Sequence, residues 1–242
     1  MFLNKSIVVT GGTRGIGAQI VKMFASEGAN VICTGRDEID LMARRKNAPD
    51  NVKYIQLDLE DEESVSSFNK YISGLSSLDV LVNNAGINKI DRVENISMAD
   101  FKSVMEVNVN GPFYISKMAC KLMMEKGGHV VNIASIWSNI TKEGRASYST
   151  SKAALVGLTR SLAVDFAGCN VLVNAVSPGF TATDLTSDSL TTNEIINLES
   201  QIPCNRMAEP KEIAELVLFL TSSKNTYITG QNFVIDGGFS IV

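Results

Sequence analysis

Histidine is almost absent from this chain, and cysteine is scarce and scattered. The single histidine, His129, stands at the start of a predicted strand, so a histidine-dependent catalytic triad has little support and a structural role is expected. The four cysteines, Cys33, Cys120, Cys169 and Cys204, lie far apart and show neither metal-binding nor redox-pair spacing. We therefore expect four reduced thiols, no metal site, and chemistry carried by other residue types.

Long apolar runs and an excess of basic charge are also missing. No run reaches the length of about 20 residues that a helix needs to cross a membrane. The 22 lysines and arginines against 26 aspartates and glutamates leave a net charge of −4, which argues against a surface for nucleic acid. The N-terminus enters a predicted strand at once and lacks the form of a signal peptide. We therefore expect a cytoplasmic protein that binds neither membrane nor nucleic acid.

Strand-like and helix-like segments alternate along the whole chain. The predicted strands are residues 5–10, 30–34, 51–57, 78–82, 129–134, 170–176 and 232–235. The predicted helices are residues 18–27, 61–73, 97–124, 148–166 and 211–220, with another beginning near Asp37. Such alternation predicts one α/β domain over residues 1–242, a Rossmann-like, doubly wound, parallel seven-stranded sheet with helices on both faces. Ligands bind such sheets at the carboxyl ends of the strands.

A glycine-rich loop follows the first predicted strand and opens the first helix. It reads Gly11-Gly12-Thr13-Arg14-Gly15-Ile16-Gly17. Glycines allow a tight turn and a close backbone approach, and a helix N-terminus offers free N–H groups to a phosphate. The loop therefore predicts nucleotide binding. The alternative is a glycine turn that serves only the packing of helix against strand.

The end of the second predicted strand favours NADP over NAD. An acid at this place accepts hydrogen bonds from the adenosine ribose and repels a 2′-phosphate. Gly35 and Arg36 occupy the strand end instead, and Arg14 adds a second positive charge that suits the phosphate. Asp37 is the competing ribose acid, but we expect it to start the following helix. Asp58, which ends the third strand, is expected to hold the adenine amino group.

Ser135, Tyr148 and Lys152 bring together groups suited to proton transfer. Tyr148 and Lys152 are four residues apart at the start of a helix and so share one helical face. An ammonium group there favours the phenolate and lowers the pKa of the tyrosine, which can then exchange a proton near neutral pH. The Ser135 hydroxyl is placed to hydrogen-bond a substrate oxygen. The simpler alternative is a surface Tyr–Lys pair and a turn serine.

Three further stretches have unusual patterns. Residues 108–112 interrupt the helix predicted over 97–124 with a Gly-Pro pair, which is costly enough to predict a kink with a purpose. Residues 184–205 are polar and lack strong periodicity, which predicts a mobile lid. Asn83-Asn84-Ala85-Gly86 ends the fourth strand with small residues that leave room for a cofactor. The alternative is a polar turn in which Asn83 only ties neighbouring strands together.

These motifs, in this order, resemble those of the short-chain dehydrogenase/reductase family over essentially the whole chain. The resemblance rests on Thr10-Gly11-x-x-x-Gly15-Ile16-Gly17, Asn83-Asn84-Ala85-Gly86, Asn108, Ser135, Tyr148-x-x-x-Lys152, Pro178-Gly179 and Asp236-Gly237-Gly238. It implies that Tyr148 is the proton donor in reduction and that Ser135 holds the substrate oxygen. It also implies that Lys152 binds the nicotinamide ribose and that Asn108 holds a water linking Lys152 to solvent. Hydride would pass directly from the nicotinamide.

The cofactor expected from the loop, the strand ends and the resemblance is NADPH or NADP, with NAD less favoured. Its expected binding residues are Gly11, Thr13, Arg14, Gly15, Ile16, Gly17, Arg36, Asp58, Leu59, Asn84, Ala85, Gly86, Tyr148, Lys152, Pro178, Gly179 and Thr181. The substrate would be a ketone, either a small molecule or bound to a carrier.

Within the family, the chain is most similar to bacterial β-ketoacyl-[acyl-carrier-protein] reductases. The compact length and the segments 178–184 and 227–231 carry this similarity, which implies an acyl carrier protein as partner. The basic residues expected to grip the carrier are only partly kept, because Lys126 holds one place and Cys169 another. Trp137 and the loop Thr141-Lys142-Glu143-Gly144-Arg145 are also not the small residues expected there. These departures leave room for a sugar, polyol or nucleotide-linked sugar as substrate. A non-catalytic NADP-binding regulator has less support, because all four tetrad residues remain.

Apolar residues at two places favour assembly. The helix predicted over residues 148–166 has apolar groups on several faces, and the chain end Phe239-Ser240-Ile241-Val242 would be poorly covered in a monomer. Members of the resembled family commonly form tetramers. We therefore expect a homotetramer with twofold axes.

Overall fold

One parallel sheet of seven strands forms the centre of the computed structural model, which describes residues 1–183 and 191–242. The strands are β1 Ser6–Val9, β2 Asn30–Gly35, β3 Val52–Gln56, β4 Val80–Asn83, β5 Gly128–Ile133, β6 Val171–Pro178 and β7 Asn232–Ile235. Their order is β3-β2-β1-β4-β5-β6-β7, and each pairing is parallel. The strand order reverses between β1 and β4, so a ligand crevice is expected beyond their carboxyl ends. The predicted seven-stranded doubly wound sheet is confirmed.

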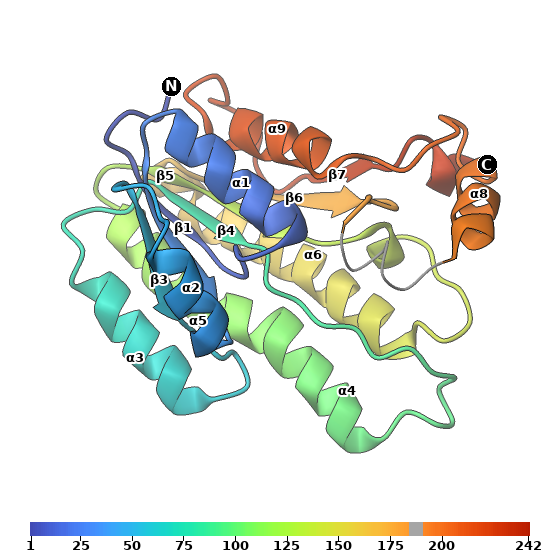
Figure 1. The fold of residues 1–242 in the computed structure, drawn as a ribbon. Coiled ribbons are helices and arrows are strands. Elements are labelled where there is room, and N and C mark those ends of the chain that lie inside the picture. Colours follow the sequence, from blue (N-terminus) through green and yellow to red (C-terminus); the bar gives the residue numbers. More distant parts are fainter. Residues whose placement is uncertain (184–190) are drawn as a thin grey trace.

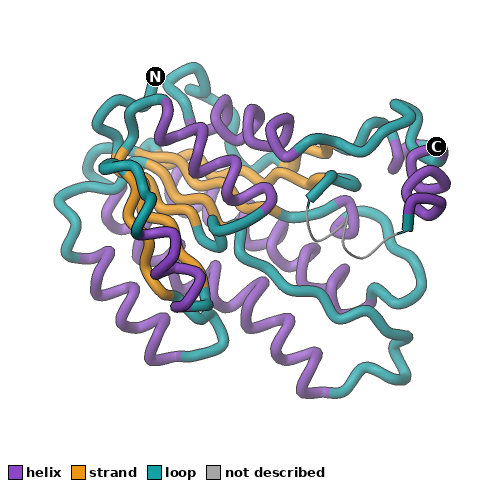
Figure 2. Tube along the Cα trace, viewed as in Figure 1, coloured by secondary structure: helices purple, strands orange, loops and turns teal. Residues whose placement is uncertain are grey.

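Helices cover both faces of this sheet (Figures 1 and 2). They are α1 Gly15–Ser26, α2 Glu38–Arg45, α3 Glu62–Ser73, α4 Met98–Met105, α5 Gly111–Met123, α6 Ala146–Phe166, α8 Thr192–Ser200 and α9 Pro210–Thr221. On one face α1 packs beside α9, and on the other α3 packs beside α5 and α4 beside α6. Short 3-10 helices are η2 Ile136–Ser138, η3 Ala167–Cys169 and η4 Phe239–Ile241.

The two layers of core follow from the alternation of side chains along the strands. In β1, Ile7 and Val9 belong to the apolar cluster under α1 and α9, whereas Val8 belongs to the cluster under α3, α5 and α6. All three are fully buried. Successive residues of a strand point to opposite faces, so a strand covered on both sides must be apolar throughout. This is why the strands were recognisable as continuous apolar runs.

Asp37 begins α2 as expected. It is the N-cap of that helix, and its carboxylate accepts hydrogen bonds from the backbone N–H groups of Ile39, at 2.8 Å, and Asp40. Such caps satisfy donors that the first helical turn leaves free. The first helix differs from its prediction, because it begins at Gly15 and not at residue 18. The end of the glycine loop is therefore also the first helical turn.

The predicted kink lies in the middle of the long helical region. A π-helical turn, η1 Glu106–Asn110, separates α4 from α5, and Pro112 stands in the first turn of α5. Proline is tolerated there because its missing N–H has no partner in that turn. The π-turn carries Asn108, which is fully buried. π-turns of this kind are frequent at functional sites. Here the turn places Asn108 against Ile87 in the loop after β4.

The segment predicted as a lid contains regular structure that the sequence did not suggest. Residues Thr192–Ser200 form α8, which Thr191 and Glu194 start with reciprocal side-chain-to-backbone hydrogen bonds. This capping box satisfies donors at the start of α8 in a stretch without strong apolar periodicity. The prediction for residues 184–190 lies outside the described residues.

The histidine and two of the four free cysteines lie wholly or partly in the interior. His129 is partly buried, and its Nε2 lies 3.4 Å from the carbonyl oxygen of Asn225; burial lowers the pKa of this histidine. Cys33 and Cys120 are buried thiols, and burial raises the pKa of each to about 12. Across residues 1–183 and 191–242, no helix is both long enough and apolar enough to span a bilayer.

Candidate active site

Gly11 and Gly17 in the loop after β1 have no room for side chains. Gly11 has a φ of 62°, which favours glycine. A Cβ on Gly17 would lie 2.3 Å from the carbonyl oxygen of Gly11 and 2.4 Å from Nδ2 of Asn84. The loop therefore keeps its backbone open for a phosphate at the start of α1. Arg14 is the N-cap residue of α1, and its side chain is exposed beside this cradle.

Thr10 ties the ends of β1 and β4 together. Its Oγ1 accepts hydrogen bonds from the backbone N–H groups of Asn84, at 3.0 Å, and Ala85, at 3.1 Å. The amide of Asn84 in turn donates to the carbonyl oxygens of Thr10 and Gly11, the latter at 2.8 Å. These bonds place the small residues Ala85 and Gly86 directly beside the glycine loop. Thr10 entered the sequence analysis only as part of a motif, and this tie gives it a positioning role.

Opposite charges meet beyond the ends of β2 and β3. Arg36 is exposed, and its guanidinium lies 3.5 Å from the carboxylate of Glu60. Asp37 is turned into its own helix, as described above. Asp58 accepts a hydrogen bond from the backbone N–H of Glu60 at 3.0 Å, and Leu59 is buried. Arg36, after the second strand, is thus paired with Glu60, an acid that the sequence analysis did not consider.

The site residues from β4, η1 and α6 meet at Gly86. A Cβ on Gly86 would lie 3.3 Å from Oδ1 of Asn108 and 3.4 Å from Nζ of Lys152. Across the crevice, Gly179 follows β6, and a Cβ there would lie 2.6 Å from that of Asp236. Oγ1 of Thr181 donates to the carbonyl oxygen of Gly179 at 3.3 Å. This lining of glycines and small residues fits an extended dinucleotide along the strand ends.

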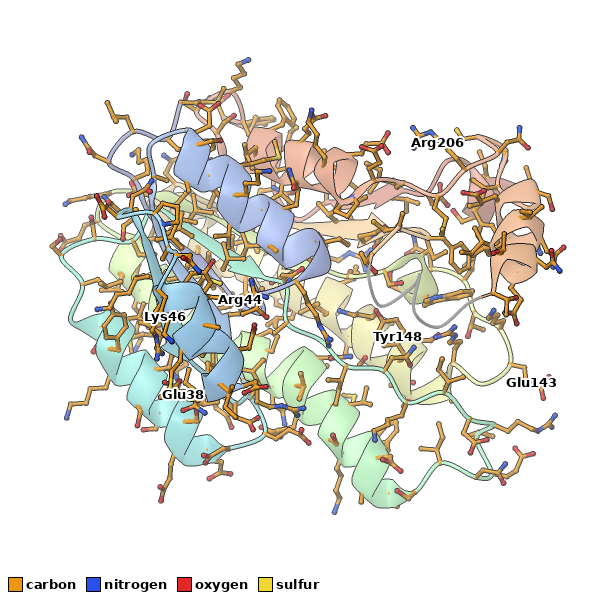
Figure 3. The ribbon with its side chains drawn as sticks, viewed as in Figure 1. Glu38, Arg44, Lys46, Glu143, Tyr148 and Arg206 are labelled. Carbon is orange, nitrogen blue, oxygen red and sulfur yellow. The ribbon has the colours of Figure 1, made fainter. Side chains whose placement is uncertain are left out.

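Lys152 and Tyr148 lie together on α6, as the spacing predicts. The ammonium of Lys152 is buried, donates to the carbonyl oxygen of Ile133 at 2.8 Å, and lies 5.5 Å from the centre of the Tyr148 ring. Figure 3 labels Tyr148 beside α6. Ser135 follows β5, and its Oγ accepts a hydrogen bond from the backbone N–H of Trp137 at 3.3 Å. The structure therefore brings a phenol, an ammonium and a hydroxyl to one place.

Burial outweighs the groups that would lower the pKa of Tyr148 in this structure. Burial raises the pKa of Tyr148, while the nearby Ser135 hydroxyl and the Arg145 guanidinium oppose that rise. Burial also lowers the pKa of Lys152 to about 8. Because the Lys152 ammonium lies beside the ring and donates to Ile133, its own desolvation dominates. A cation that favours the phenolate here is Arg145, which the sequence analysis named only as part of the loop 141–145.

Asn108 is held by hydrogen bonds on both sides of its amide. Its Nδ2 donates to the carbonyl oxygen of Ile87 at 2.9 Å and to Oγ of Ser151 at 3.0 Å. Its Oδ1 accepts from the backbone N–H of Ile87 at 2.9 Å. These bonds lock the π-turn against the loop after β4 and against α6. Asn108 therefore has a structural function whatever else it binds.

Beneath the site, polar side chains bridge neighbouring strands. Asn83 Nδ2 donates to Oδ1 of Asn132 at 2.7 Å and to Oγ of Ser116 at 2.9 Å. Asn132 donates to Oγ1 of Thr159 on α6 at 2.9 Å. The alternative reading of Asn83 as a tie between strands is thus confirmed. This buried network fixes β4 and β5 against the helices that carry the site.

Aromatic residues and two cations form the outer wall of the site. Trp137 packs edge-on against Phe180, and Phe180 packs against Phe239 with ring centres 5.0 Å apart. The Arg145 guanidinium lies 5.4 Å and the Lys142 ammonium 5.6 Å from the centre of the Trp137 ring. Trp137, Lys142 and Phe239 also line a pocket of about 390 Å³. The sequence offered no periodic signal for this cluster, because its members come from distant segments.

A family model described as enoyl-(acyl carrier protein) reductase matches residues 11–240, nearly the whole chain. The chain belongs to the short-chain dehydrogenase/reductase family. It is 38% identical over 245 residues to the 3-oxoacyl-[acyl-carrier-protein] reductase FabG of Aquifex aeolicus, covering 97% of this chain and 96% of that protein. It is 34% identical over 243 residues to FabG of Escherichia coli, covering 100% of this chain and 99% of that protein.

Solved structures of the family agree with this assignment. A short-chain dehydrogenase/reductase family protein superposes with a TM-score of 0.90 at 35% identity, with both chains covered in full. A Beutenbergia cavernae protein assigned as an NAD(P)-dependent gluconate 5-dehydrogenase, with bound NADP, superposes with a TM-score of 0.91 at 32% identity, covering 98% and 97% of the two chains. The chain is therefore an oxidoreductase that acts on CH–OH and C=O groups.

Proposed function

We propose that this oxidoreductase uses NADPH to reduce the ketone of a 3-oxoacyl thioester to a secondary alcohol. The observation that carries the proposal is the meeting of Tyr148, Lys152 and Ser135 beside a glycine-lined crevice at the carboxyl ends of β1, β4 and β5. FabG relatives over the full length support the choice of substrate class.

In the proposed mechanism, each catalytic residue acts on the substrate or on its neighbour. The nicotinamide, when bound, supplies a hydride to the carbonyl carbon. Tyr148 gives its phenolic proton to the carbonyl oxygen, and Ser135 donates a hydrogen bond to the same oxygen, so the product leaves as a neutral alcohol. Lys152 holds the nicotinamide ribose beside Tyr148. Asn108 keeps Lys152 in place from the π-turn and orders the water that links it to solvent.

The choice of NADPH over NADH rests on charge. Arg36 and Arg14 are exposed at the adenosine side, and Asp37 is occupied as a helix cap. The two guanidinium groups would form charge-assisted hydrogen bonds with the 2′-phosphate, which NADPH has and NADH lacks. We also propose that the other expected cofactor-binding residues contact the dinucleotide. Among them, the backbone N–H groups of residues 15–17 at the start of α1 would contact its phosphates.

An acyl carrier protein is the proposed partner and the cytoplasm the proposed location. We also propose that the 242-residue chain is one domain and assembles as a homotetramer. Support comes from uncovered apolar groups, since Val164 on α6 is 80% exposed and the terminal Ile241 and Val242 are 86% and 88% exposed. Exposed apolar residues of this kind are typical of protein interfaces.

A second candidate is oxidation of a sugar acid. It is favoured by the superposition on the gluconate 5-dehydrogenase relative and by the cations beside Trp137. The test is a substrate screen that follows NADPH absorbance. We expect turnover of acetoacetyl-N-acetylcysteamine, a soluble 3-oxoacyl thioester. Turnover of gluconate with NADP, and none of the thioester, would replace the first proposal by the second.

A further inference from the structure

Arg145 lies close to Tyr148 and forms no ion pair within residues 1–183 and 191–242. Its Nε is buried and has no hydrogen-bond partner in residues 1–183 and 191–242. Burial lowers the pKa of this guanidinium, which shows that its environment disfavours the charge. The side chain as a whole is half-buried, but a buried donor atom without a partner costs stability, which favours an oxygen acceptor from outside the described residues.

The acid nearest to Arg145 in sequence is turned away from it. Glu143 pairs with Arg92 from the loop after β4, with its side chain 69% exposed. Figure 3 shows Glu143 at the outer edge of the molecule, away from Tyr148. Arg145 also forms none of the ion pairs seen among the described residues, since those involve other partners. The guanidinium is therefore available to a ligand.

The position of Arg145 is set by the helix and by an aromatic ring. It is the N-cap residue of α6, three places before Tyr148, and residues so spaced are neighbours on a helix. Its guanidinium lies over Trp137, 5.4 Å from the ring centre, and the Trp137 side chain is buried. A cation stacked on a fixed ring loses little further freedom when it binds. It is thus held beside the phenol that donates the proton.

We infer that Arg145 is a substrate-binding residue that receives a second oxygen of the substrate, carried two carbons from the reacting ketone. This inference rests on the proposed function, because a 3-oxoacyl thioester has such an oxygen in its thioester carbonyl. The ketone oxygen lies at Tyr148 and Ser135, and the thioester oxygen accepts from the guanidinium. A free 3-oxo acid offers a carboxylate oxygen at the same place.

The test compares two ketones that differ only in this oxygen. One is acetoacetyl-N-acetylcysteamine, and the other is the thioether ketone in which a CH₂ group replaces the thioester carbonyl. For the wild type and Arg145→Met, kcat/KM is measured with NADPH, or the inhibition constant where turnover is too slow. We expect Arg145→Met to reduce the preference for the thioester by about ten-fold or more, the usual value of one charge-assisted hydrogen bond.

The ratio separates binding from an effect on the proton donor. The charge of Arg145 also favours the Tyr148 phenolate, so its removal slows reduction of both ketones. Such a loss cancels in the ratio, and equal losses on both ketones, or none, would overturn the inference. Arg145→Lys keeps the charge but not the planar fork and should retain part of the preference. It also serves if Arg145→Met fails to fold, as judged by circular dichroism.

Controls test whether the effect is specific to Arg145, which substrate oxygen Arg145 binds, and whether the proposed function holds. Arg45→Gln removes an exposed arginine that pairs with Glu38 on α2, and it should leave the ratio unchanged. Acetoacetate as a third substrate separates the sources, since a larger Arg145→Met loss with the acid than with the thioester assigns the site to carboxylates. If the wild type reduces neither but oxidises gluconate, the proposed function fails. Arg145 is then judged by whether Arg145→Met lowers the preference for gluconate over 3-deoxygluconate, which lacks the hydroxyl two carbons from C5, and an unchanged preference overturns the inference.

Discussion

We expect Arg36 and Glu60 together to set the preference for NADPH over NADH. Arg36 lies 3.5 Å from Glu60 and keeps 67% of its side chain exposed. An exposed pair of this kind is worth about 0.2–1 kcal/mol. A charge-assisted hydrogen bond to a phosphate is worth about 1.5–3 kcal/mol. Exchanging the first for the second leaves roughly 0.5–3 kcal/mol in favour of NADPH, or about two-fold to more than 100-fold.

The assay is kcat/KM for NADPH and NADH with one ketone substrate. Arg36→Ala should lower the NADPH preference by that factor. Glu60→Gln should raise it, because the neutral amide neither competes for Arg36 nor repels the phosphate. Asp37→Asn is the contrast, since this carboxylate caps α2 and should affect stability more than preference. A wild type that prefers NADH, or an Arg36→Ala variant with unchanged preference, would refute the reasoning.

Three other predictions follow from burial and packing. Lys152→Met should stabilise the fold near pH 7 by up to about 3 kcal/mol, because burial lowers the folded pKa of Lys152 to about 8. The cost of burying its charge is full below pH 8 and fades toward pH 10.5. Denaturant unfolding at pH 7 and pH 10 measures this gain in stability, and a gain that grows with pH would contradict the argument. Gly17→Ala should cost about 1–3 kcal/mol and weaken NADPH binding, since its Cβ meets backbone at 2.3 Å. Gly168→Ala, whose Cβ meets nothing within 4 Å, should be neutral or stabilising in thermal unfolding, and equal effects of the two substitutions would refute the packing argument. Light scattering should give four times the chain mass of 26.1 kDa, and a monomer at micromolar concentration would contradict the tetramer.

The fold was predictable because its signals are local. Each buried strand is a short apolar run, and the glycine loop and the Tyr148–Lys152 spacing can be read within a few residues. The kink at residues 108–112 was visible for the same reason, since Gly111 and Pro112 are costly inside a helix. The helix α8 was missed because its capping box is local but its apolar periodicity is weak.

The parts that escaped prediction depend on distant contacts. The pKa of Tyr148 follows from burial under the finished fold and from Arg145, and not from its spacing to Lys152 alone. The pairing of Arg36 with Glu60 joins the ends of two strands that only the sheet makes neighbours. The wall of Trp137, Phe180 and Phe239 likewise joins three segments. No periodicity in one segment predicts such contacts, because each partner is chosen by tertiary structure.

The most direct test of the account is the effect of Tyr148→Phe on NADPH consumption with acetoacetyl-N-acetylcysteamine. The substitution removes one hydroxyl from a half-buried ring and should leave the fold intact. General acid catalysis contributes about 10²–10⁴-fold, so turnover should fall at least that far while NADPH still binds. Near-normal turnover by the Phe variant would contradict the proton-donor role of Tyr148, and no turnover by the wild type would contradict the proposed substrate.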